Sequence, residues 1–390
     1  MVRARVLVIL LFCGARTGPQ RVISIMSRCL KELGHEVQIL SLIYEPSETF
    51  ETLHNVATVV RSIKVSSILK RLHKLFMHRF RRFQPYLQGV PLNVFITPII
   101  AFIGYMRFKP DIIVLNGGNA LAILLKLLLP KVSIIAYYHG FLESYLSDKP
   151  LAKFLRIFEK CTLRRIVCCT VSRHMAEEFE KVSGVKPMVL YPAADVEPLL
   201  KLPRQEDGRT LLYVGRIASY RKQHTLVKAM NIIKHYVPEA RLVLAGTLKL
   251  SDQQYYTYLR KLIERYNLSK QITIRDIRSD RDLLRLYQVS TVYVNPVAET
   301  FGLNVVEALA AGLPAIVYKY GGQAEIVRHG IEGFHFLTRE DLVHYVVKLL
   351  EDSQLRHEMS LNARMRALYF TPLAFRFRLK RIIKLASQRC

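Results

Sequence analysis

The sequence predicts an α/β protein built from two doubly wound, Rossmann-like domains, each with a parallel sheet covered by helices. Three observations support this prediction. The chain has 390 residues, more than a single core comfortably accommodates. Short β-like runs alternate with helical runs along both halves, which is typical of parallel sheets. Proline, glycine and charged residues with little periodicity separate the two halves at residues 195–210.

The first half begins with an apolar run from Val6 to Phe12, a glycine-containing turn from Gly14 to Gln20, and a helical pattern from Arg21 to Leu33. The basic residues ahead of the apolar run also resemble the head of a secretory signal. The strand, turn and helix leave no place for a cleavage site, so we expect a buried first strand. Further strands are predicted at residues 37–42, 111–115, 134–138, 166–170 and 188–191.

The second half repeats this alternation. Residues 1–194 are therefore predicted as the first domain, 195–210 as the linker and 211–370 as the second domain, with a final helical segment at 371–390. Its strands are predicted at residues 211–214, 241–244, 272–275, 291–294 and 315–317.

The composition is strongly basic, with 58 Lys and Arg against 31 Asp and Glu and a formal charge of +27. This balance predicts a polyanionic partner: nucleic acid, anionic lipid or a phosphorylated substrate. A hydrophobic content of 51% excludes wholesale disorder. The six cysteines form no Cys-x-x-Cys pair and are predicted to be core thiols in a reducing compartment.

One basic segment stands apart from the predicted domains. Residues 61–82 hold eight Lys or Arg and no acidic residue, interleaved with apolar residues. This pattern predicts a basic amphipathic helix on an anionic membrane surface; the alternative is a solvated helix face over the core. The apolar stretch from Pro91 to Met106 is too short and interrupted for a membrane span, and is either a core helix or an entry for a lipid. We expect a peripheral protein on the cytosolic face of a membrane.

Two glutamates mark the most informative stretch of the second half. Phe301-Gly302 is predicted to be a tight turn, and a helix is predicted from Leu303 to the glycine and proline stop signals at Gly312 and Pro314. Glu299 then precedes this helix and Glu307 lies on it. Backbone N–H groups at a helix start attract anions, so the stretch predicts a nucleotide-sugar site.

Other motifs follow in a fixed order from Leu211 to Phe336. They are Leu211-Leu212-Tyr213-Val214-Gly215-Arg216 with Arg221 and Lys222, Leu242 to Gly246, Thr291 to Pro296, and Gly321-Gly322 with Glu325, Gly330 and Gly333. The ordered set resembles retaining glycosyltransferases of the GT-B type, in particular glycosyltransferase family 4. The resemblance implies two facing domains, with the last helix, 371–390, crossing back onto the first. It also implies a nucleotide diphosphate hexose, GDP- or UDP-linked, as donor, and neither cofactor nor metal.

The resemblance also implies roles for single residues. Glu299 would contact the hydroxyls of the donor sugar and Glu307 those of the ribose. The remaining donor contacts would fall to the diphosphate-binding residues Arg216, Arg221 or Lys222, Gly302, Leu303 and Asn304. The family's lysine falls five residues after the arginine; Arg221 occupies that position here and Lys222 follows it, so either could meet the diphosphate.

For three further candidate site residues, the sequence also offers a reason to doubt a role in binding or catalysis. His139 ends a predicted strand of the first domain, where ligands of open α/β sheets bind. The resemblance implies a catalytic histidine close to the sugar at this strand end, although a lone histidine is more often structural. Gly18 resembles the family's glycine loop facing the phosphates, but Pro19 replaces the second glycine and offers no N–H group. Glu325 matches the glutamate of the loop opposite the sugar, or it caps the helix that begins there.

The hypothesis that combines these observations is transfer of a hexose to a membrane-associated acceptor, such as a polyprenyl-phosphate-linked glycan. The motif from Tyr191 to Asp195 resembles the form found in family members that build lipid-linked oligosaccharides. The alternatives are a soluble glycan synthase, a nucleotide-sugar epimerase, a catalytically silent scaffold and a nucleic-acid-binding protein. The sequence has no recognisable nucleic-acid module, and its basic residues cluster with aliphatic side chains, so no nucleic acid is expected.

Overall fold

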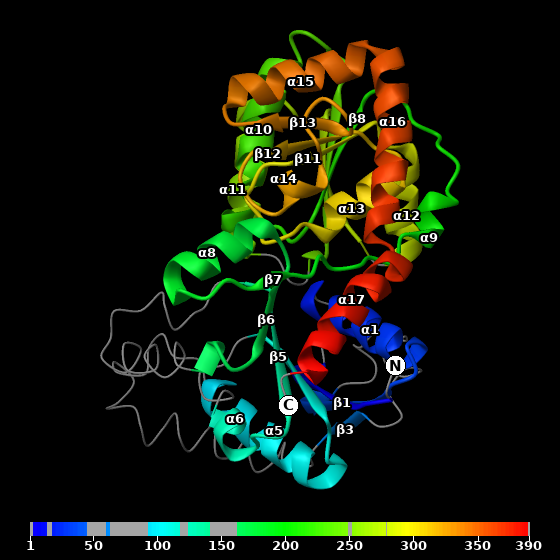
Figure 1. Cartoon of the computed structure of the whole chain (residues 1–390). Coiled ribbons are helices and arrows are strands. Elements are labelled where there is room, and N and C mark those ends of the chain that lie inside the picture. Colours follow the sequence, from blue (N-terminus) through cyan, green and yellow to red (C-terminus); the bar gives the residue numbers. More distant parts are fainter. Residues whose placement is uncertain are drawn as a thin grey trace, which may run out of the picture. The chain divides into compact units, whose positions relative to one another are not determined.

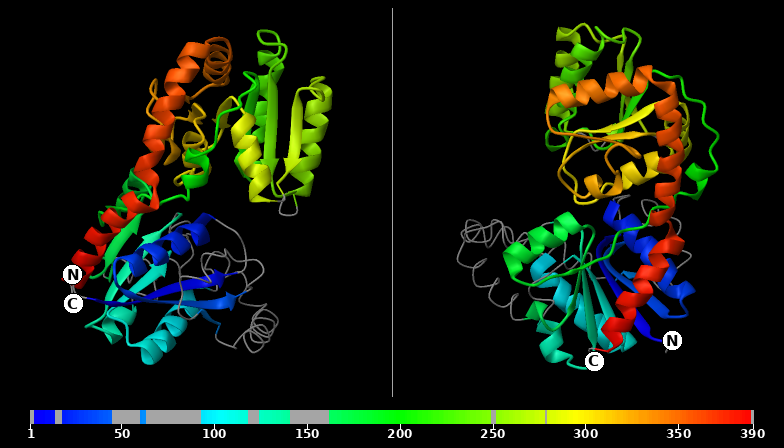
Figure 2. Two further views of the ribbon diagram at one scale, coloured as in Figure 1. Left: turned by 90° about the vertical axis from the view of Figure 1, so that its right-hand side faces the viewer. Right: turned by 45° about the horizontal axis from the view of Figure 1, so that its top comes forward.

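The computed structural model describes residues 3–13, 18–44, 60–62, 93–117, 124–140, 162–248, 252–277 and 279–388. The chain divides into two compact units. One comprises Met1–Ala193 together with Pro372–Cys390, and the other comprises Ala194–Thr371. Each unit has a parallel sheet with helices on both faces (Figures 1 and 2). The predicted fold class is thereby confirmed.

The first unit contains a sheet of seven strands in the order β3-β2-β1-β4-β5-β6-β7, all paired in parallel. The order reverses between β1 and β4, which is the point where open sheets of this kind bind ligands. The strands are β1 (Arg5–Cys13), β2 (Glu36–Tyr44), β3 (Val60–Ser62), β4 (Ile112–Asn116), β5 (Ser133–Tyr138), β6 (Val167–Thr170) and β7 (Met188–Val189).

The helices of this unit include one from the far end of the chain. They are α1 (Gly18–Glu32), α5 (Asn93–Phe108), α6 (Leu124–Leu128), α8 (Arg173–Ser183) and α17 (Pro372–Ser387). Helix α17 packs along α1 and against β5 and β6 (Figure 1). The Ser133 hydroxyl donates to the carbonyl of Ala386 at 2.5 Å, which ties the end of α17 to the start of β5. The last helix therefore packs on the first unit, as the resemblance implied.

The start of α1 differs from its prediction. The helix begins at Gly18 rather than Arg21, so the predicted turn is wrong over its last three residues. Pro19 lies in the first helical turn, where the missing N–H group would have no helical partner. Gly18 is exposed.

The structure describes only the first two residues of the basic segment at 61–82. Arg61 and Ser62 belong to β3, which pairs with Leu40 and Ser41 of β2, so the predicted helix is wrong over these two residues. Residues 63–82 lie outside the described residues. A three-residue strand forms here because β2 offers an open edge, which the local pattern could not reveal.

The apolar stretch that follows forms α5. Its inner face packs on β1 and β2, where a Cβ on Gly104 would lie 2.7 Å from a methyl group of Leu7 and 2.9 Å from one of Leu40. Glycine at this position lets the helix approach the sheet closely. Among the described residues, none of the helices combines the length and low charge that a bilayer-spanning segment needs.

The second unit contains a sheet of six parallel strands in the order β10-β9-β8-β11-β12-β13. Its order reverses between β8 and β11. The strands are β8 (Thr210–Val214), β9 (Arg241–Gly246), β10 (Ile272–Asp276), β11 (Val292–Asn295), β12 (Ala315–Tyr318) and β13 (Gly333–Phe336).

Helices cover both faces of this second sheet. Side-chain oxygens of Ser279, Thr338 and Asp352 accept backbone N–H groups and fix where three of the helices begin. The helices are α9 (Glu197–Leu200), α10 (Gln223–Ile233), α11 (Gln253–Arg265), α12 (Asp280–Val289), α13 (Leu303–Ala310), α14 (Gln323–Ile326), α15 (Arg339–Glu351) and α16 (Ser353–Ala367).

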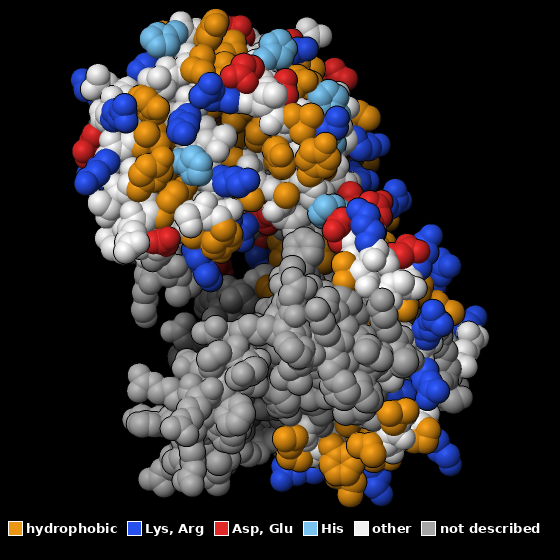
Figure 3. All heavy atoms as spheres, turned by 90° about the vertical axis from the view of Figure 1, so that its left-hand side faces the viewer, with side chains coloured by type: hydrophobic (Ala, Val, Ile, Leu, Met, Phe, Trp, Pro, Cys, Tyr) orange, Lys and Arg blue, Asp and Glu red, His pale blue; other side chains and the backbone are white. Residues whose placement is uncertain are grey.

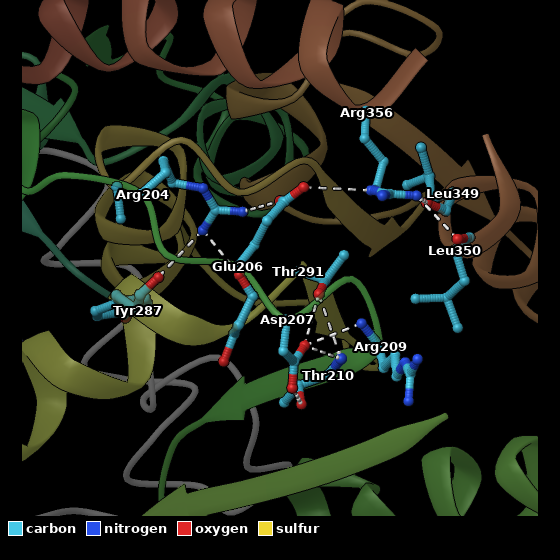
Figure 4. Close-up of polar contacts among 12 residues, drawn as sticks. Arg204, Glu206, Asp207, Arg209, Thr210, Tyr287, Thr291, Leu349, Leu350 and Arg356 are labelled. Carbon is cyan, nitrogen blue, oxygen red and sulfur yellow. Dashed lines mark hydrogen bonds and ion pairs between the residues drawn. The ribbon is translucent and has the colours of Figure 1, made fainter. Parts of the chain in front are cut away.

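Residues 195–210, predicted as the linker, belong to the second unit. Figure 4 shows their polar contacts. Arg204 donates to the carbonyls of Tyr287 at 3.3 Å and Ser290 at 2.8 Å, and it pairs with Glu206. Burial lowers the pKa of Arg204, against the opposing effect of Glu206. This stretch is therefore anchored to α12 and the loop after it.

Asp207 anchors the end of the same stretch to the sheet. Its carboxylate accepts the backbone N–H groups of Arg209 at 2.9 Å and Thr210 at 2.8 Å, and the hydroxyl of Thr291 at 3.0 Å (Figure 4). These bonds connect the first residue of β8 to the residue before β11. They fix the two strands on which the candidate site is built.

Candidate functional site

The predicted donor residues of the second unit gather around the carboxyl ends of β8 and β11. These strands are neighbours in the sheet, with Val292 opposite Leu211 and Tyr293 opposite Leu212. The order of the sheet reverses between them, so the loops that follow diverge and leave room for a ligand. The Gly-Arg turn follows β8, and the loop containing Glu299 follows β11.

Backbone contacts fix the Gly-Arg turn. The N–H group of Gly215 donates to the carbonyl of Ala245 at 2.8 Å, and Gln223 donates its side-chain amide to the carbonyl of Arg216 at 2.7 Å. Gly246 must be glycine, since a Cβ there would lie 2.2 Å from the carbonyl oxygen of Gly215. The side chain of Arg216 is exposed. The turn is thus rigid while its guanidinium remains available to an anion.

Arg221 and Lys222 have different environments. Arg221 ends a short 3-10 helix (Ser219–Arg221), and its Nη1 donates to Oε1 of Glu299 at 2.7 Å. Lys222 is exposed and has a left-handed backbone with φ of 52°, which ends this turn and begins α10. The structure therefore brings Arg221, rather than Lys222, to the glutamate.

Burial and neighbouring charges have opposite effects on the pKa of Arg221. Burial alone would lower the pKa of Arg221, but the carboxylate of Glu299 and nearby tyrosine hydroxyls raise it above its usual value. Burial raises the pKa of Tyr213, which lies under the turn. A Cβ on Gly215 would lie 2.6 Å from the Tyr213 hydroxyl, so the turn can carry no side chain there. Arg221 is therefore a permanent cation.

Glu299 is held by both its side chain and its backbone. Asn295, at the end of β11, donates its amide to Oε1 at 3.0 Å, beside the bond from Arg221. The backbone N–H of Glu299 donates to Oε1 of Gln323 at 2.8 Å, and its carbonyl accepts the N–H of Gly322 at 2.7 Å. These four bonds give the carboxylate one defined position.

Gln323 joins the loop of Glu299 to the loop after β12. Its side chain is fully buried, and its amide nitrogen donates to the carbonyls of Val297 at 3.1 Å, Tyr318 at 2.9 Å and Tyr320 at 2.6 Å. Every donor and acceptor of the amide group is therefore used across the two loops.

The two glycines before Gln323 allow these loops to touch. A Cβ on Gly322 would lie 2.2 Å from the carbonyl oxygen of Thr300, and Gly321 has φ of 107°, where a side chain is strained. The Gly-Gly pair thus serves close contact between two backbones.

Helix α13 begins beside the same turn. Gly302 precedes it with φ of 106°, and its carbonyl accepts the N–H of Val305 at 3.0 Å. The N–H groups of Leu303 and Asn304 lie ahead of the first carbonyl of the helix, so the helix itself offers them no acceptor. Asn304 donates its side-chain amide to the carbonyl of Val214 at 2.8 Å, which ties this helix start to the end of β8. Leu303 and Asn304 are partly exposed. A positive helix end therefore adjoins the Gly-Arg turn.

Glu307 and Glu325 occupy different settings. Glu307 is 1% exposed, and its Oε2 accepts the hydroxyl of Tyr287 from α12 at 3.1 Å. Glu325 lies in the first turn of α14, partly exposed, and Arg366 donates to its backbone carbonyl at 2.7 Å. The second predicted glutamate is thus held inside the unit, close behind the start of α13.

His139 and Gly18 belong to the first unit. His139 follows β5, and its ring centroid lies 4.4 Å from that of Tyr137. In the part of the chain that the structure describes, its Nε2 is buried without a hydrogen-bond partner. Burial lowers the pKa of His139 to about 3. The imidazole is therefore neutral at physiological pH and can offer a hydrogen bond but not a positive charge.

Sequence reasoning did not assign three of the residues that organise the site. Asn295 follows an apolar run in the sequence and Gln323 follows two glycines, whereas Tyr287 belongs to none of the motifs. Their partners lie 4, 24 and 20 residues away in the sequence. A polar residue at the carboxyl end of a strand next to the sheet's reversal is a signal that could have identified Asn295.

The described residues contain no group of three or more His, Cys, Asp or Glu side chains placed to hold a metal ion. Around the carboxyl ends of β8 and β11, positive charge comes from Arg216, Arg221 and Lys222 and from the start of α13.

Two protein-family models match the chain, and the boundary between them lies close to the boundary between the two units. Residues 16–198 match the model described as Glycosyltransferase Family 4, and residues 200–366 match the model described as Glycosyl transferases group 1. The second match spans every residue of the site built on β8, β11 and α13.

Curated relatives align mainly over part of their length. The putative glycosyltransferase YtcC of Bacillus subtilis is 31% identical over 169 residues, which is 41% of this chain and 40% of that protein. The alpha-monoglucosyldiacylglycerol synthase of Acholeplasma laidlawii is 30% identical over 175 residues, 44% of this chain and 43% of that protein. The chain thus spans less than half the length of each of these two relatives.

Solved structures agree with the fold over nearly the whole chain. Anabaena Alr3699/HepE, crystallised in complex with UDP-glucose, has a TM-score of 0.72 at 16% identity and covers 99% of this chain and 100% of its own. A glycosyltransferase from Rickettsia africae has a TM-score of 0.71 at 16% identity, covering 99% and 98%. The two parallel-sheet units and these neighbours show that the chain has the GT-B fold, and both of its halves match glycosyltransferase family models.

Proposed function

We propose that this protein transfers a hexose, with retention of configuration, from a nucleotide diphosphate sugar to a lipid-linked glycan at a membrane surface. The observation that supports it best is the position of Glu299. Its carboxylate is fixed by Arg221 and Asn295 beside the start of α13, so a hydroxyl-binding acid and an anion-binding helix end adjoin each other. A nucleotide sugar presents both a hydroxylated ring and a diphosphate.

The diphosphate would bind to the helix start and the Gly-Arg turn. Backbone N–H groups of Leu303 and Asn304 and the guanidinium of Arg216 offer hydrogen bonds and positive charge to the phosphate oxygens. Gly302 lets those oxygens approach the backbone. The same groups would stabilise the negative charge that grows as the diphosphate leaves, which is the task a metal ion performs elsewhere. Arg221, with Lys222 nearby, completes this positive surface.

Glu299 would bind the hydroxyls of the sugar, and Glu307 those of the ribose. Arg221 has a double part in this scheme, because it bonds to Glu299 in the free protein and occupies the position from which the family's lysine reaches the diphosphate. Donor binding would then draw the guanidinium between carboxylate and phosphate.

The proposed transfer step breaks one bond to the anomeric carbon and forms another. The bond between the anomeric carbon and the diphosphate oxygen breaks, and a bond from the acceptor hydroxyl oxygen forms on the same face of the sugar. The acceptor proton passes to an oxygen of the departing phosphate. A neutral His139 would supply a hydrogen bond to the sugar rather than a proton.

The acceptor is proposed from charge and from similarity. The net charge of +27 favours an anionic surface, and one of the relatives is named for synthesis of a glucosylated diacylglycerol. A lipid-linked acceptor and a peripheral position on the cytosolic face of a membrane satisfy both observations.

The first experiment is donor binding and hydrolysis across a panel of GDP- and UDP-linked hexoses, with wild type, Glu299→Ala and a matched control. Glu340→Ala removes an exposed glutamate of the same unit. We expect one preferred donor, loss of turnover in Glu299→Ala and no change in Glu340→Ala. Vesicles that contain polyprenyl-phosphate glycans should convert hydrolysis into transfer.

Two results would contradict the proposal. If no nucleotide sugar binds to the wild type, the donor class is wrong. If Glu299→Ala and Glu340→Ala have the same turnover, the site is wrong even though the fold stands.

A further inference from the structure

Helix α5 has two apolar faces, of which the sheet covers one. Ala101 is fully buried against β1 and β2, where Gly104 also approaches the sheet. On the other side, Ile99, Phe102 and Met106 are 61%, 43% and 60% exposed. Positions separated by three, four and seven residues share one side of a helix, so these three side chains form a single outward stripe.

Helix α6 extends this surface. It packs beside α5, and its Leu127 and Leu128 are 52% and 67% exposed. Figure 3 shows apolar side chains gathered at the end of the first unit where these helices lie, with Lys and Arg side chains beside them. The α5–α6 face is defined as Ile99, Phe102, Met106, Leu127 and Leu128. Large apolar side chains grouped in this way mark an interaction surface rather than ordinary solvated protein.

The surroundings of the α5–α6 face are basic. Arg107, Lys109 and Lys131 are exposed at the ends of the two helices. The described residues 93–117 and 124–140, which include both helices, contain four Lys or Arg and a single acidic residue, Asp111. Oδ2 of Asp111 accepts the backbone N–H of Arg5 at 2.7 Å. The partner must therefore tolerate apolar side chains and carry negative charge.

We propose that the α5–α6 face docks the protein on a bilayer of anionic phospholipid. The apolar stripe would enter the boundary between headgroups and acyl chains, and the basic residues would contact the phosphates. A second copy of the chain is the wrong partner, because it would bring two surfaces of the same sign together in a protein with a net charge of +27. The inference rests on the proposed membrane-bound acceptor and assigns that contact to a surface outside the donor site.

The test is cosedimentation of the full chain with vesicles of phosphatidylcholine alone and of phosphatidylcholine mixed with phosphatidylglycerol, without donor or acceptor. Wild type should bind the mixed vesicles more strongly. Phe102→Ser combined with Met106→Ser should lower the partition coefficient about tenfold or more. Lys109→Gln and Lys131→Gln should each lower it about fivefold at low salt. Met365→Ser, which alters a methionine that is 68% exposed in the second unit, is the matched control and should not change it.

Three outcomes would overturn the proposal. Wild type could fail to bind mixed vesicles, the control could weaken binding as much as the stripe variants, or the stripe variants could dissociate a dimer and leave vesicle binding unchanged. Donor hydrolysis measured on the same variants separates this inference from the proposed function. Full hydrolysis with lost vesicle binding supports docking, whereas vesicle binding without hydrolysis leaves docking intact and overturns the proposed donor chemistry.

Discussion

Nη1 of Arg221 lies 2.7 Å from Oε1 of Glu299, although the two residues are 78 positions apart in the sequence. Their side chains are 27% and 17% exposed, so water screens the pair less than it screens a surface ion pair. The bond connects the turn after β8 with the loop after β11 across the reversal of the sheet. In the free protein each charge therefore has its partner, and an anionic donor must compete for the guanidinium.

Replacing Arg221 tests this competition. Arg221→Ala should lower kcat/KM for the donor about a hundredfold, because a hydrogen bond to a charged group contributes about 1.5–3 kcal/mol. Arg221→Lys should recover part of this loss, since it restores charge without the planar pair of donors. Steady-state kinetics of donor hydrolysis provide the measurement.

Arg339→Ala is the control for Arg221, since Arg339 pairs with exposed Glu340 on the same unit. Equal kinetics for Arg221→Ala and Arg339→Ala would show that the Arg221–Glu299 bond has no part in donor turnover. A double-mutant cycle with Glu299→Gln then measures how strongly the two side chains are coupled.

Sequence patterns predicted most of the fold because strands buried on both faces are continuous apolar runs between glycines and charges. The exceptions are elements that depend on tertiary contact. β13 is four residues long, begins at Gly333 and forms because β12 offers its edge. β3 joins β2 for the same reason. Local propensity in such short segments is weaker than the pairing that decides them.

The sequence predicted the main residues of the candidate site but not the contacts that hold them in place. Glu299, Arg216 and Gly302 stand in motifs whose spacing carries the information. The bonds that fix them join loops distant in the sequence, and an amide such as that of Gln323 becomes informative only when the loops at 297–300 and 318–322 lie side by side.

Gln323 provides a second prediction. Gln323→Met fills the same volume but leaves three carbonyls and the N–H of Glu299 without their buried partner. Each unsatisfied group costs about 1–3 kcal/mol, so the second unit should be destabilised by about 3 kcal/mol or more. Thermal unfolding measures this loss.

Activity should fall further than stability alone explains if Gln323 positions Glu299. Gln323→Glu keeps an acceptor for the N–H of Glu299 but loses the donor amide, so it should leave donor KM closer to wild type than Gln323→Met does. A kcat and KM that stay at wild-type values in folded Gln323→Met would limit the role of the amide to folding.

Tyr287 provides a third prediction. Its hydroxyl donates to Oε2 of Glu307 at 3.1 Å, and Glu307 is 1% exposed. Tyr287→Phe removes this donor and keeps the ring, so the buried carboxylate loses a partner that contributes about 1–2 kcal/mol. Donor KM should rise about tenfold while kcat changes little, because the ribose is bound in both the ground state and the transition state.

The comparison that checks this is the same kinetic series with a nucleotide whose ribose lacks its hydroxyls. Tyr287→Phe should weaken the natural donor more than the deoxy analogue. An equal loss for both nucleotides would mean that Glu307 does not bind the ribose.

The fourth prediction concerns His139, which should make the free energy of unfolding depend on pH. Burial lowers its pKa from 6.5 to about 3, so the folded protein keeps the ring neutral while the unfolded chain takes up a proton below pH 6.5. The unfolded state then binds more protons, and the free energy of unfolding falls as the pH falls from 6.5 towards 3. The slope from this one group is at most about 1.4 kcal/mol per pH unit. Stability from the neutral ring is fully present above pH 6.5.

Denaturant unfolding of wild type and His139→Asn across this pH range isolates the contribution, since other titrating groups are common to both proteins. The wild type should lose more stability on acidification than the variant. NMR titration of the imidazole gives the direct check, with no change in ring shifts expected between about pH 5 and 8, where ordinary histidines titrate. A ring that titrates near 6.5 would show instead that His139 is solvated, and the neutral hydrogen bond proposed for it in sugar binding would then fail together with the predicted slope.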